Sequence, residues 1–140
     1  GNGGILLDKN GKQISPEGKY YGNFNFNYFA ETGMIVSSEK GKGEVLLDKN
    51  GKQVSPEGKY YNYFNFNYFA ETGMIVSSEK GKGKGEVLLD KNGKQVSPEG
   101  EYYDDIKYHA AKNKFYYDSL FFRKYIDLDN NSGDIYYDED

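Results

Sequence analysis

Residues 46–61 read LLDKNGKQVSPEGKYY, and the same stretch occurs at residues 6–21 and 88–103 with minor changes. The longer segments 5–40 and 45–80 differ only where Ile5 pairs with Val45, Ile14 with Val54, Gly22 with Asn62 and Asn23 with Tyr63. The third copy follows a short insertion within EKGKGKGE (79–86). A period of about 40 residues is typical of repeat arrays, in which each unit buries its apolar face against its neighbours.

Each copy predicts a β-hairpin followed by a second turn. In the first copy, ILLDKNGKQI predicts strands at Ile5–Leu7 and Lys12–Ile14. The turn between them runs through Asp8–Gly11, because Asn and Gly tolerate the positive φ angles that hairpin turns require. The following SPEG (15–18) predicts a further turn, in which proline fixes φ in advance.

The rest of each unit predicts two more strands. In NFNFNY (23–28) asparagine alternates with aromatic residues, which places Phe24, Phe26 and Tyr28 on one face of a strand. ETG (31–33) predicts a turn, MIVSS (34–38) a strand, and EKGKG (39–43) the loop to the next unit. We therefore expect four short strands per unit.

The last part of the chain departs from the repeat. KFYYDSLFF (114–122) is typical of a strand, with a short helix somewhere in 104–123 as the alternative, and KYIDLDNNSGDIYY (124–137) restates the hairpin pattern. We expect one repeat domain over 1–140, with units at about 4–43, 44–85 and 86–126 and a degenerate C-terminal hairpin that caps the array at 124–140. The predicted fold is all-β, built of antiparallel hairpin or meander repeats stacked as an open array or as propeller-like blades, which are too few to close into a ring.

The composition limits the function classes. Tyrosine (15 residues) and phenylalanine (9 residues) favour strands and must supply much of the buried area. The net charge of −4 argues against a nucleic-acid partner, since such proteins usually carry a basic patch. No run reaches the roughly 20 apolar residues of a membrane helix, so we expect no membrane span. Cysteine is absent, which excludes disulfides and thiolate metal sites.

The repeat resembles the bacterial WG (KWG) repeat family. The segment FAETGMIVSSEKGKGEVLLDKNGKQVSPEGKYY (29–61) follows the order of that family's strand, turn, Asp-Lys-Asn-Gly-Lys hairpin and proline segment, and SPEGEYYDDI (97–106) is similar to the segment after its proline. The likeness covers most of the chain, but GKGE stands where the family has Trp-Gly, with no aromatic residue before Gly43. The resemblance implies a β-rich bacterial repeat protein and no reaction.

A second resemblance concerns the tyrosines. GKYY at 18–21 and 58–61 is similar to the Tyr-rich repeats of clostridial surface proteins, which implies glycan binding. The candidate binding residues are Tyr20, Tyr21, Tyr60, Tyr61 and Tyr63. The aromatic strand NYFNFNYF (62–69) has three interpretations, namely a core strand, a platform on which sugars stack, or a strand that associates with other copies.

Few residues suggest chemistry. His109 is the single histidine, no G-x-S-x-G sequence accompanies it, and we expect a packing or surface role. No cofactor is expected, with Ca²⁺ at the C-terminal turn as the alternative, because oxygen ligands at alternate positions suit this cation. The candidate metal ligands are Asp127, Asp129, Asn131 and Asp138. For the repeat turns, such as the one at Asp48, the aspartate is expected to cap the turn by accepting backbone N–H groups.

The sequence thus favours a non-catalytic module that presents a binding surface to a protein or a glycan. The competing interpretation is a structural protein whose near-identical units associate through their edges into homo-oligomers or filaments.

Overall fold

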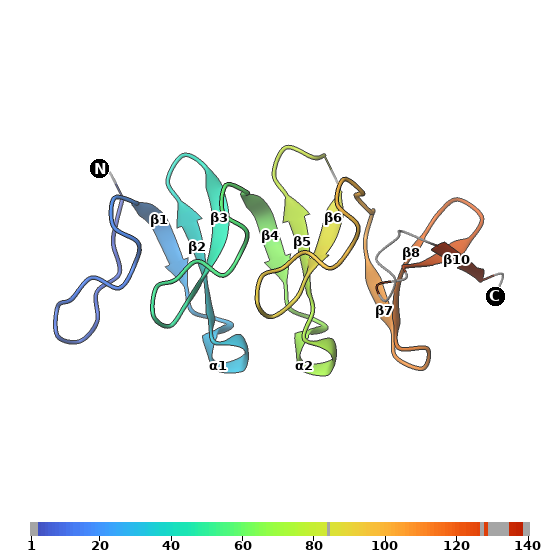
Figure 1. Cartoon of the computed structure of the whole chain (residues 1–140), viewed down its shortest axis with the longest axis horizontal. Coiled ribbons are helices and arrows are strands. Elements are labelled where there is room, and N and C mark those ends of the chain that lie inside the picture. Colours follow the sequence, from blue (N-terminus) through green and yellow to red (C-terminus); the bar gives the residue numbers. More distant parts are fainter. Residues whose placement is uncertain (1–2, 84, 127, 129–134, 139–140) are drawn as a thin grey trace.

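The computed structural model describes residues 3–83, 85–126, 128 and 135–138, and the fold is all-β and antiparallel as predicted. A six-stranded sheet follows the chain in the order β1 (Tyr21–Asn25), β2 (Met34–Glu39), β3 (Gly43–Asp48), β4 (Tyr61–Asn65), β5 (Ile75–Glu79) and β6 (Glu86–Leu89). A second sheet has the order β10-β9-β8-β7, with β7 at Lys107–His109, β8 at Lys114–Asp118, β9 at Arg123–Ile126 and β10 at Ile135–Asp138. Figure 1 shows the units in an open row, with β1 and β10 toward opposite ends.

The hairpins of the repeated stretch are built alike in all three copies. The carboxylate of Asp48 accepts the backbone N–H of Asn50 at 2.8 Å and of Lys52 at 3.0 Å, and Asp8 and Asp90 do the same in their copies. The capping role predicted for these aspartates is confirmed. The return strand is short, since only single bridges such as Leu47↔Gln53 pair it with the outgoing strand. The second unit therefore has three full strands, β3, β4 and β5, and a minimal fourth.

Serine and glutamine explain the second half of the repeated stretch. The buried Ser55 hydroxyl accepts the backbone N–H of Leu46 at 2.9 Å, and Ser15 and Ser97 repeat this bond. The Gln53 amide donates to the carbonyls of Ser55 and Pro56, which fixes the SPEG turn against the hairpin. These bonds satisfy backbone groups that would otherwise be buried without partners, so the order of residues in the stretch is dictated by one local bonding scheme.

The aromatic segment differs from the predicted continuous strand. A β-bulge at residue 22 or 62 shifts the alternation, so Tyr61 and Phe64 share a face with ring centroids 4.9 Å apart. The strand stops at Asn65, whose side-chain oxygen accepts the N–H of Asn67. One-turn helices then form at α1 (Phe29–Thr32) and α2 (Phe69–Thr72), each ended by a left-handed glycine at 33 or 73. The prediction that Phe24, Phe26 and Tyr28 line one strand face is wrong beyond Asn25.

The cores lie mainly between successive units. One cluster joins residues of all three units and contains Met34, Val36, Leu46, Tyr61, Phe64, Phe66, Ile75, Val87 and Leu89. Phe64 and Phe66 are buried, which confirms the core interpretation for this part of the aromatic strand. Each unit thus covers its neighbour, as repeat proteins require.

The second sheet continues the array. Val76 and Leu88 pack against Tyr103, Ile106, Phe115 and Ile126, so the last strands cover the end of the second unit. The alternative of a helix in 104–123 is wrong, because the strands β7 and β8 occupy that segment. β9 and β10 pair antiparallel, with Ile126 opposite Ile135.

Candidate functional site

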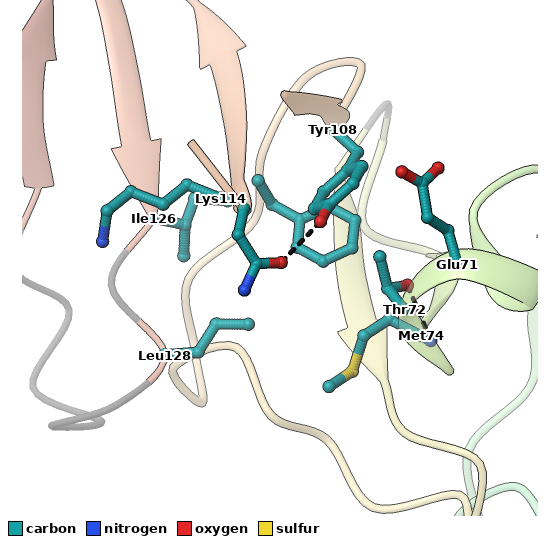
Figure 2. A pocket seen from close by; sticks show the side chains of 9 residues that line it. Glu71, Thr72, Met74, Tyr108, Lys114, Ile126 and Leu128 are labelled. Carbon is teal, nitrogen blue, oxygen red and sulfur yellow. Dashed lines mark hydrogen bonds between the residues drawn. The ribbon is translucent and has the colours of Figure 1, made fainter. Parts of the chain in front are cut away.

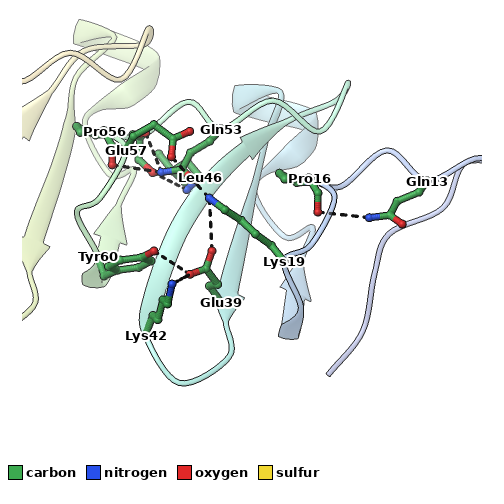
Figure 3. Close-up of polar contacts among 11 residues, drawn as sticks. Gln13, Pro16, Lys19, Glu39, Lys42, Leu46, Gln53, Pro56, Glu57 and Tyr60 are labelled. Carbon is green, nitrogen blue, oxygen red and sulfur yellow. Dashed lines mark hydrogen bonds and ion pairs between the residues drawn. The ribbon is translucent and has the colours of Figure 1, made fainter. Parts of the chain in front are cut away.

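A polar cluster ties each unit to the next (Figure 3). Glu39, at the end of β2, is only 4% exposed, and its Oε2 accepts the Tyr60 hydroxyl of the following unit at 2.8 Å. Lys19 lies 3.6 Å from its other carboxylate oxygen, and Lys42 lies 3.5 Å from Oε2. In the next copy the Tyr102 hydroxyl donates to Glu79 at the same 2.8 Å. A buried carboxylate is stable only when it is paired in this way.

Burial also changes the ionisation of the tyrosines at these joints. Desolvation, followed by the charge of Glu39, raises the pKa of Tyr21 to about 12. Desolvation, the hydrogen bond to Glu79 and that carboxylate's charge raise the pKa of Tyr102 to about 12. Burial raises the pKa of Tyr61 even further. These phenols therefore stay protonated at any physiological pH. Of the three, the Tyr102 hydroxyl donates to Glu79, whereas the buried hydroxyls of Tyr21 and Tyr61 have no hydrogen-bond partner among the described residues.

The apolar part of each joint is equally regular. Val45 and Leu47 of β3 are 0% exposed, and β2 pairs with them through Ser37 and Ile35. The ring of Tyr28 in the first unit lies 4.8 Å from that of Phe66 in the second. The turn glycine Gly51 approaches the Ile14 carbonyl so closely that a Cβ would stand 1.4 Å from its oxygen. Neighbouring units therefore contact each other through a paired strand, an aromatic ring and a turn whose glycine has no side chain.

The first copy carries the same residues, and among the described residues no unit packs on them as the preceding units pack on the other two copies. Ile5 and Leu7 are 40% and 49% exposed, whereas their counterparts in the other two copies are 0% exposed. Phe26 is 49% exposed against 5% for Phe66, and Tyr20 is 48% exposed. Among the described residues, no atom outside Gly11 and its two chain neighbours lies within 4 Å of the position that a Cβ on Gly11 would take. We call Ile5, Leu7, Gly11, Tyr20 and Phe26 the N-terminal face.

The backbone of the N-terminal face is an open strand edge. The backbone groups of Gly4 bond to Tyr21, and those of Leu6 bond to Ile14 and Ser15. The N–H of Asp8 bonds to the carbonyl of Lys12. Along an extended strand, alternate residues point their backbone groups to opposite sides. The groups of Ile5 and Leu7 therefore point outward, and they form no backbone hydrogen bond within the described part of the chain. For this reason residues 5–7 do not form a strand of the sheet, contrary to the prediction. Residues 45–47 and 87–89 do form strands of the sheet.

The five predicted binding tyrosines fall into different environments. Tyr21 and Tyr61 are buried in the core and present no ring face to solvent. Tyr60 is half-buried and bonded to Glu39, and the hydroxyl of the exposed Tyr63 donates to Glu86. Tyr20 is exposed and lies on the N-terminal face. The structure therefore does not bring these residues together into one platform.

Three of the predicted calcium ligands, Asp127, Asp129 and Asn131, lie outside the described residues. Asp138 lies on β10, opposite Arg123 of β9. Within the ranges that the structure describes, no three His, Cys, Asp or Glu residues gather as a metal site would require. The calcium prediction therefore stays a prediction.

A pocket of about 400 Å³ lies between α2 and the second sheet (Figure 2). Its lining combines Met74, Phe115, Ile126 and Leu128 with the polar groups of Glu71 and Lys114. The Tyr108 hydroxyl is already bonded to Asn113, and the Thr72 hydroxyl to the Tyr68 carbonyl. His109 is not among the lining residues, and its ring lies beside those of Tyr116 and Tyr125. No nucleophile, base and acid converge here among the residues described.

Sequence reasoning did not identify Ile5, Leu7 and Phe26 as candidates. The exposure of these side chains depends on packing between units and has no local signal in the sequence of the copy. Of the predicted binding tyrosines, Tyr20 belongs to the N-terminal face.

The comparisons with known proteins give no match: no family model, curated protein or solved structure is similar to this chain. Over the residues that can be placed, the model contains no helix with the length and hydrophobicity needed to cross a membrane.

Proposed function

We propose that the chain is a non-catalytic β-repeat module that binds a protein partner through its N-terminal face. The observation that carries the proposal is the contrast between Ile5 and Leu7, which are 40% and 49% exposed, and their counterparts, which are 0% exposed. Sequence and local conformation are shared by the copies, so the difference comes from the strands β2 and β5, which pair with the later copies. The resemblance to WG repeats agrees with a module of this kind.

An open edge of this type favours a β-strand as ligand. An extended segment can bond to the outward N–H and C=O groups of Ile5 and Leu7, while their side chains offer apolar contacts. Full burial of an aliphatic side chain contributes about 1.5–3 kcal/mol, and these two are about half exposed, so each retains roughly 1 kcal/mol to be gained. Natural sheet edges are usually protected by charge, proline or a bulge. Residues 4–7 (GILL) carry none of these.

A protein ligand agrees with the tyrosines better than a glycan does. Sugar stacking needs exposed ring faces, but Tyr21 and Tyr61 are buried and Tyr60 is half-buried, which leaves only Tyr20 and Tyr63 of the five exposed. The strand edge, in contrast, presents backbone donors and acceptors together with apolar side chains.

A selection from a displayed library of extended peptides tests the proposal. We expect enriched peptides whose binding is weakened about tenfold or more by Leu7→Lys, since lysine on the edge opposes strand addition. Leu120→Lys is the control, because Leu120 is 88% exposed and lies far along the chain, in the loop between β8 and β9. Bound peptides should also slow amide exchange at Ile5 and Leu7. Peptides that bind equally well to the Leu7→Lys variant would contradict the proposal.

A further inference from the structure

A second exposed surface lies at the turn between β8 and β9, inside the chain and far from the N-terminal face (Figure 1). Leu120 and Phe121 are 88% and 81% exposed, the highest values among the large apolar side chains that the structure describes. They are the two central residues of a tight turn, which we call the apolar tip. We infer that the apolar tip, together with the lysine-rich loops at the same edge of the array, binds to the surface of a lipid bilayer that carries anionic headgroups.

The turn that carries the apolar tip is held by bonds on both of its sides. The backbone N–H and the hydroxyl of Ser119 donate to the Phe122 carbonyl at 2.8 Å and 3.1 Å. Asp118 lies opposite Arg123 in the sheet, and Arg123 Nε lies 3.4 Å from its carboxylate. The guanidinium group of Arg123 also lies over the Tyr116 ring, 4.2 Å from its centroid. The turn is therefore formed in advance, so binding does not require the ordering of a loop.

Basic residues gather in the loops at this edge. Segments 40–43, 80–85 and 119–124 contain seven Lys or Arg residues and no Asp or Glu, although the whole chain has a net charge of −4. Figure 1 shows the β2–β3, β5–β6 and β8–β9 loops along the same edge of the array. Lys40 and Lys82 are exposed there, whereas Glu39 and Glu79 at the ends of the strands are buried and accept tyrosine hydroxyls. The outermost groups of these loops are therefore positive.

The attraction of this edge to an anionic surface is moderate. Asp104 and Asp105 line a shallow hollow together with Gly83 of the second lysine loop. Asp105 is paired with Lys107 at 3.4 Å, which partly neutralises its charge. A weak electrostatic attraction and a small apolar anchor each give marginal membrane binding, and stable attachment takes two such signals. The loops and the apolar tip supply one signal each.

A bilayer suits the apolar tip better than a protein does. A stable protein interface buries about 800 Å² on each partner, contributed by about twenty or more residues. The tip offers two protruding side chains, and a protein would need a matching pocket for them. A bilayer needs no such pocket, since its acyl chains adapt to side chains that enter by about 5–10 Å while its anionic headgroups meet lysines at the surface.

Co-sedimentation of the full chain with vesicles of phosphatidylcholine and phosphatidylserine in equal parts tests the inference. We expect binding that weakens about tenfold or more when Leu120→Ser is combined with Phe121→Ser, because both apolar side chains lose their transfer out of water. Both side chains are exposed, so this variant should fold as the natural chain does. Vesicles of phosphatidylcholine alone should bind weakly, and so should the mixed vesicles at high salt.

A pair of charge variants separates the lysine loops from the total charge. Lys40→Gln combined with Lys82→Gln should weaken binding to the mixed vesicles about tenfold, because two charges leave the edge that faces the lipid. Lys49→Gln combined with Lys91→Gln is the matched control. It removes the same charge from turns that follow the opposite ends of β3 and β6, and it should bind as the natural chain does.

A fluorescent reporter distinguishes insertion into lipid from other contacts, because the chain has no tryptophan. The emission of Phe121→Trp should shift to the blue on addition of the mixed vesicles and should be quenched by doxyl-labelled lipids. Ala111→Trp, in the turn at the other end of β8, should show neither change.

Three results would overturn the inference. The first is binding to the mixed vesicles that the double serine variant retains in full, or no binding at all. The second is equal binding to phosphatidylcholine alone, which would exclude the anionic surface. The third is a blue shift of Phe121→Trp that grows with protein concentration in the absence of vesicles, which would assign the apolar tip to a second copy of the chain.

Discussion

Gly51 and Gly11 occupy the same turn in two copies, with φ of 81° and 85°, yet their surroundings differ. A Cβ on Gly51 would clash with the Ile14 carbonyl, whereas the space around Gly11 is open. Both alanine substitutions cost about 1 kcal/mol for the left-handed backbone. The clash should bring the total for Gly51→Ala to about 3 kcal/mol or more. Urea unfolding of Gly51→Ala and Gly11→Ala measures the difference, and equal losses would show that the two hairpins do not touch.

The buried phenols predict an alkaline limit to stability. The pKa of Tyr21 and Tyr103 is raised to about 12, chiefly by burial, from an unfolded value near 10. Between these values the unfolded chain has lost protons that the folded chain keeps, so the free energy of unfolding falls as the pH rises. Each such tyrosine contributes a slope of up to about 1.4 kcal/mol per pH unit.

We therefore expect stability to change little between pH 7 and pH 9 through these groups and to fall steeply above about pH 10. Urea unfolding at a series of pH values, followed by tyrosine absorbance, measures this fall. A free energy of unfolding that stays constant up to pH 12 would contradict the burial of these phenols.

At the scale of the element, the joint between units depends on the bond between Tyr60 and Glu39. Tyr60→Phe leaves a carboxylate that is 4% exposed with one donor fewer, and we expect a loss of about 1.5–3 kcal/mol. Tyr20→Phe is the matched control, since Tyr20 is exposed and has no preceding glutamate, and it should cost less than about 0.5 kcal/mol. Thermal unfolding of the two variants decides the point, and similar melting temperatures would mean that the joint bond contributes nothing.

The hairpin elements could be predicted because their causes are local. Asp8, Asn10 and Gly11 determine their own turn, so the same letters form the same turn three times. The MIVSS strand was predicted for a similar reason, since its β-branched residues suit a pleated sheet and it extends from Met34 to Glu39. The all-β class followed from these elements.

The aromatic segment could not be predicted from its period. The bulge at residue 62 and the side-chain bond between Asn65 and Asn67 change the direction of the chain between residues 62 and 67, and neither alters the Asn-aromatic alternation. The candidate site failed for a different reason. Ile5 and Val45 are almost the same residue in the same local sequence, and their exposure depends only on what precedes the unit in space.

At the scale of the whole molecule, the last strands protect the second unit. Ile106, Phe115 and Ile126 cover Val76 and Leu88, which are 0% exposed. Removal of residues 104–140 should uncover this surface and leave a chain that aggregates, because an uncovered repeat end binds other chains. Size-exclusion chromatography against the full chain measures the effect. A truncated chain that stays monomeric and equally heat-resistant would show that these strands do not act as a cap.

The cap is not polar throughout. Leu120 and Phe121, in the loop between β8 and β9, are 88% and 81% exposed. The corresponding loops of the first two units consist of lysine and glycine. The two ends of the array therefore differ, since one offers a strand edge with unpaired backbone and the other an apolar loop.

The first copy of the repeat exposes the surface of Ile5 and Leu7, whereas preceding strands cover the same surface in the second and third copies. Residue-resolved hydrogen exchange on the free chain measures this directly. The amides of Val45 and Leu47 face β2 and should exchange only through large-scale unfolding, whereas those of Ile5 and Leu7 should exchange at least about a hundredfold faster. Equal protection of the amides of Ile5 and Val45 would contradict the account, because it would mean that the first copy already has its strand partner.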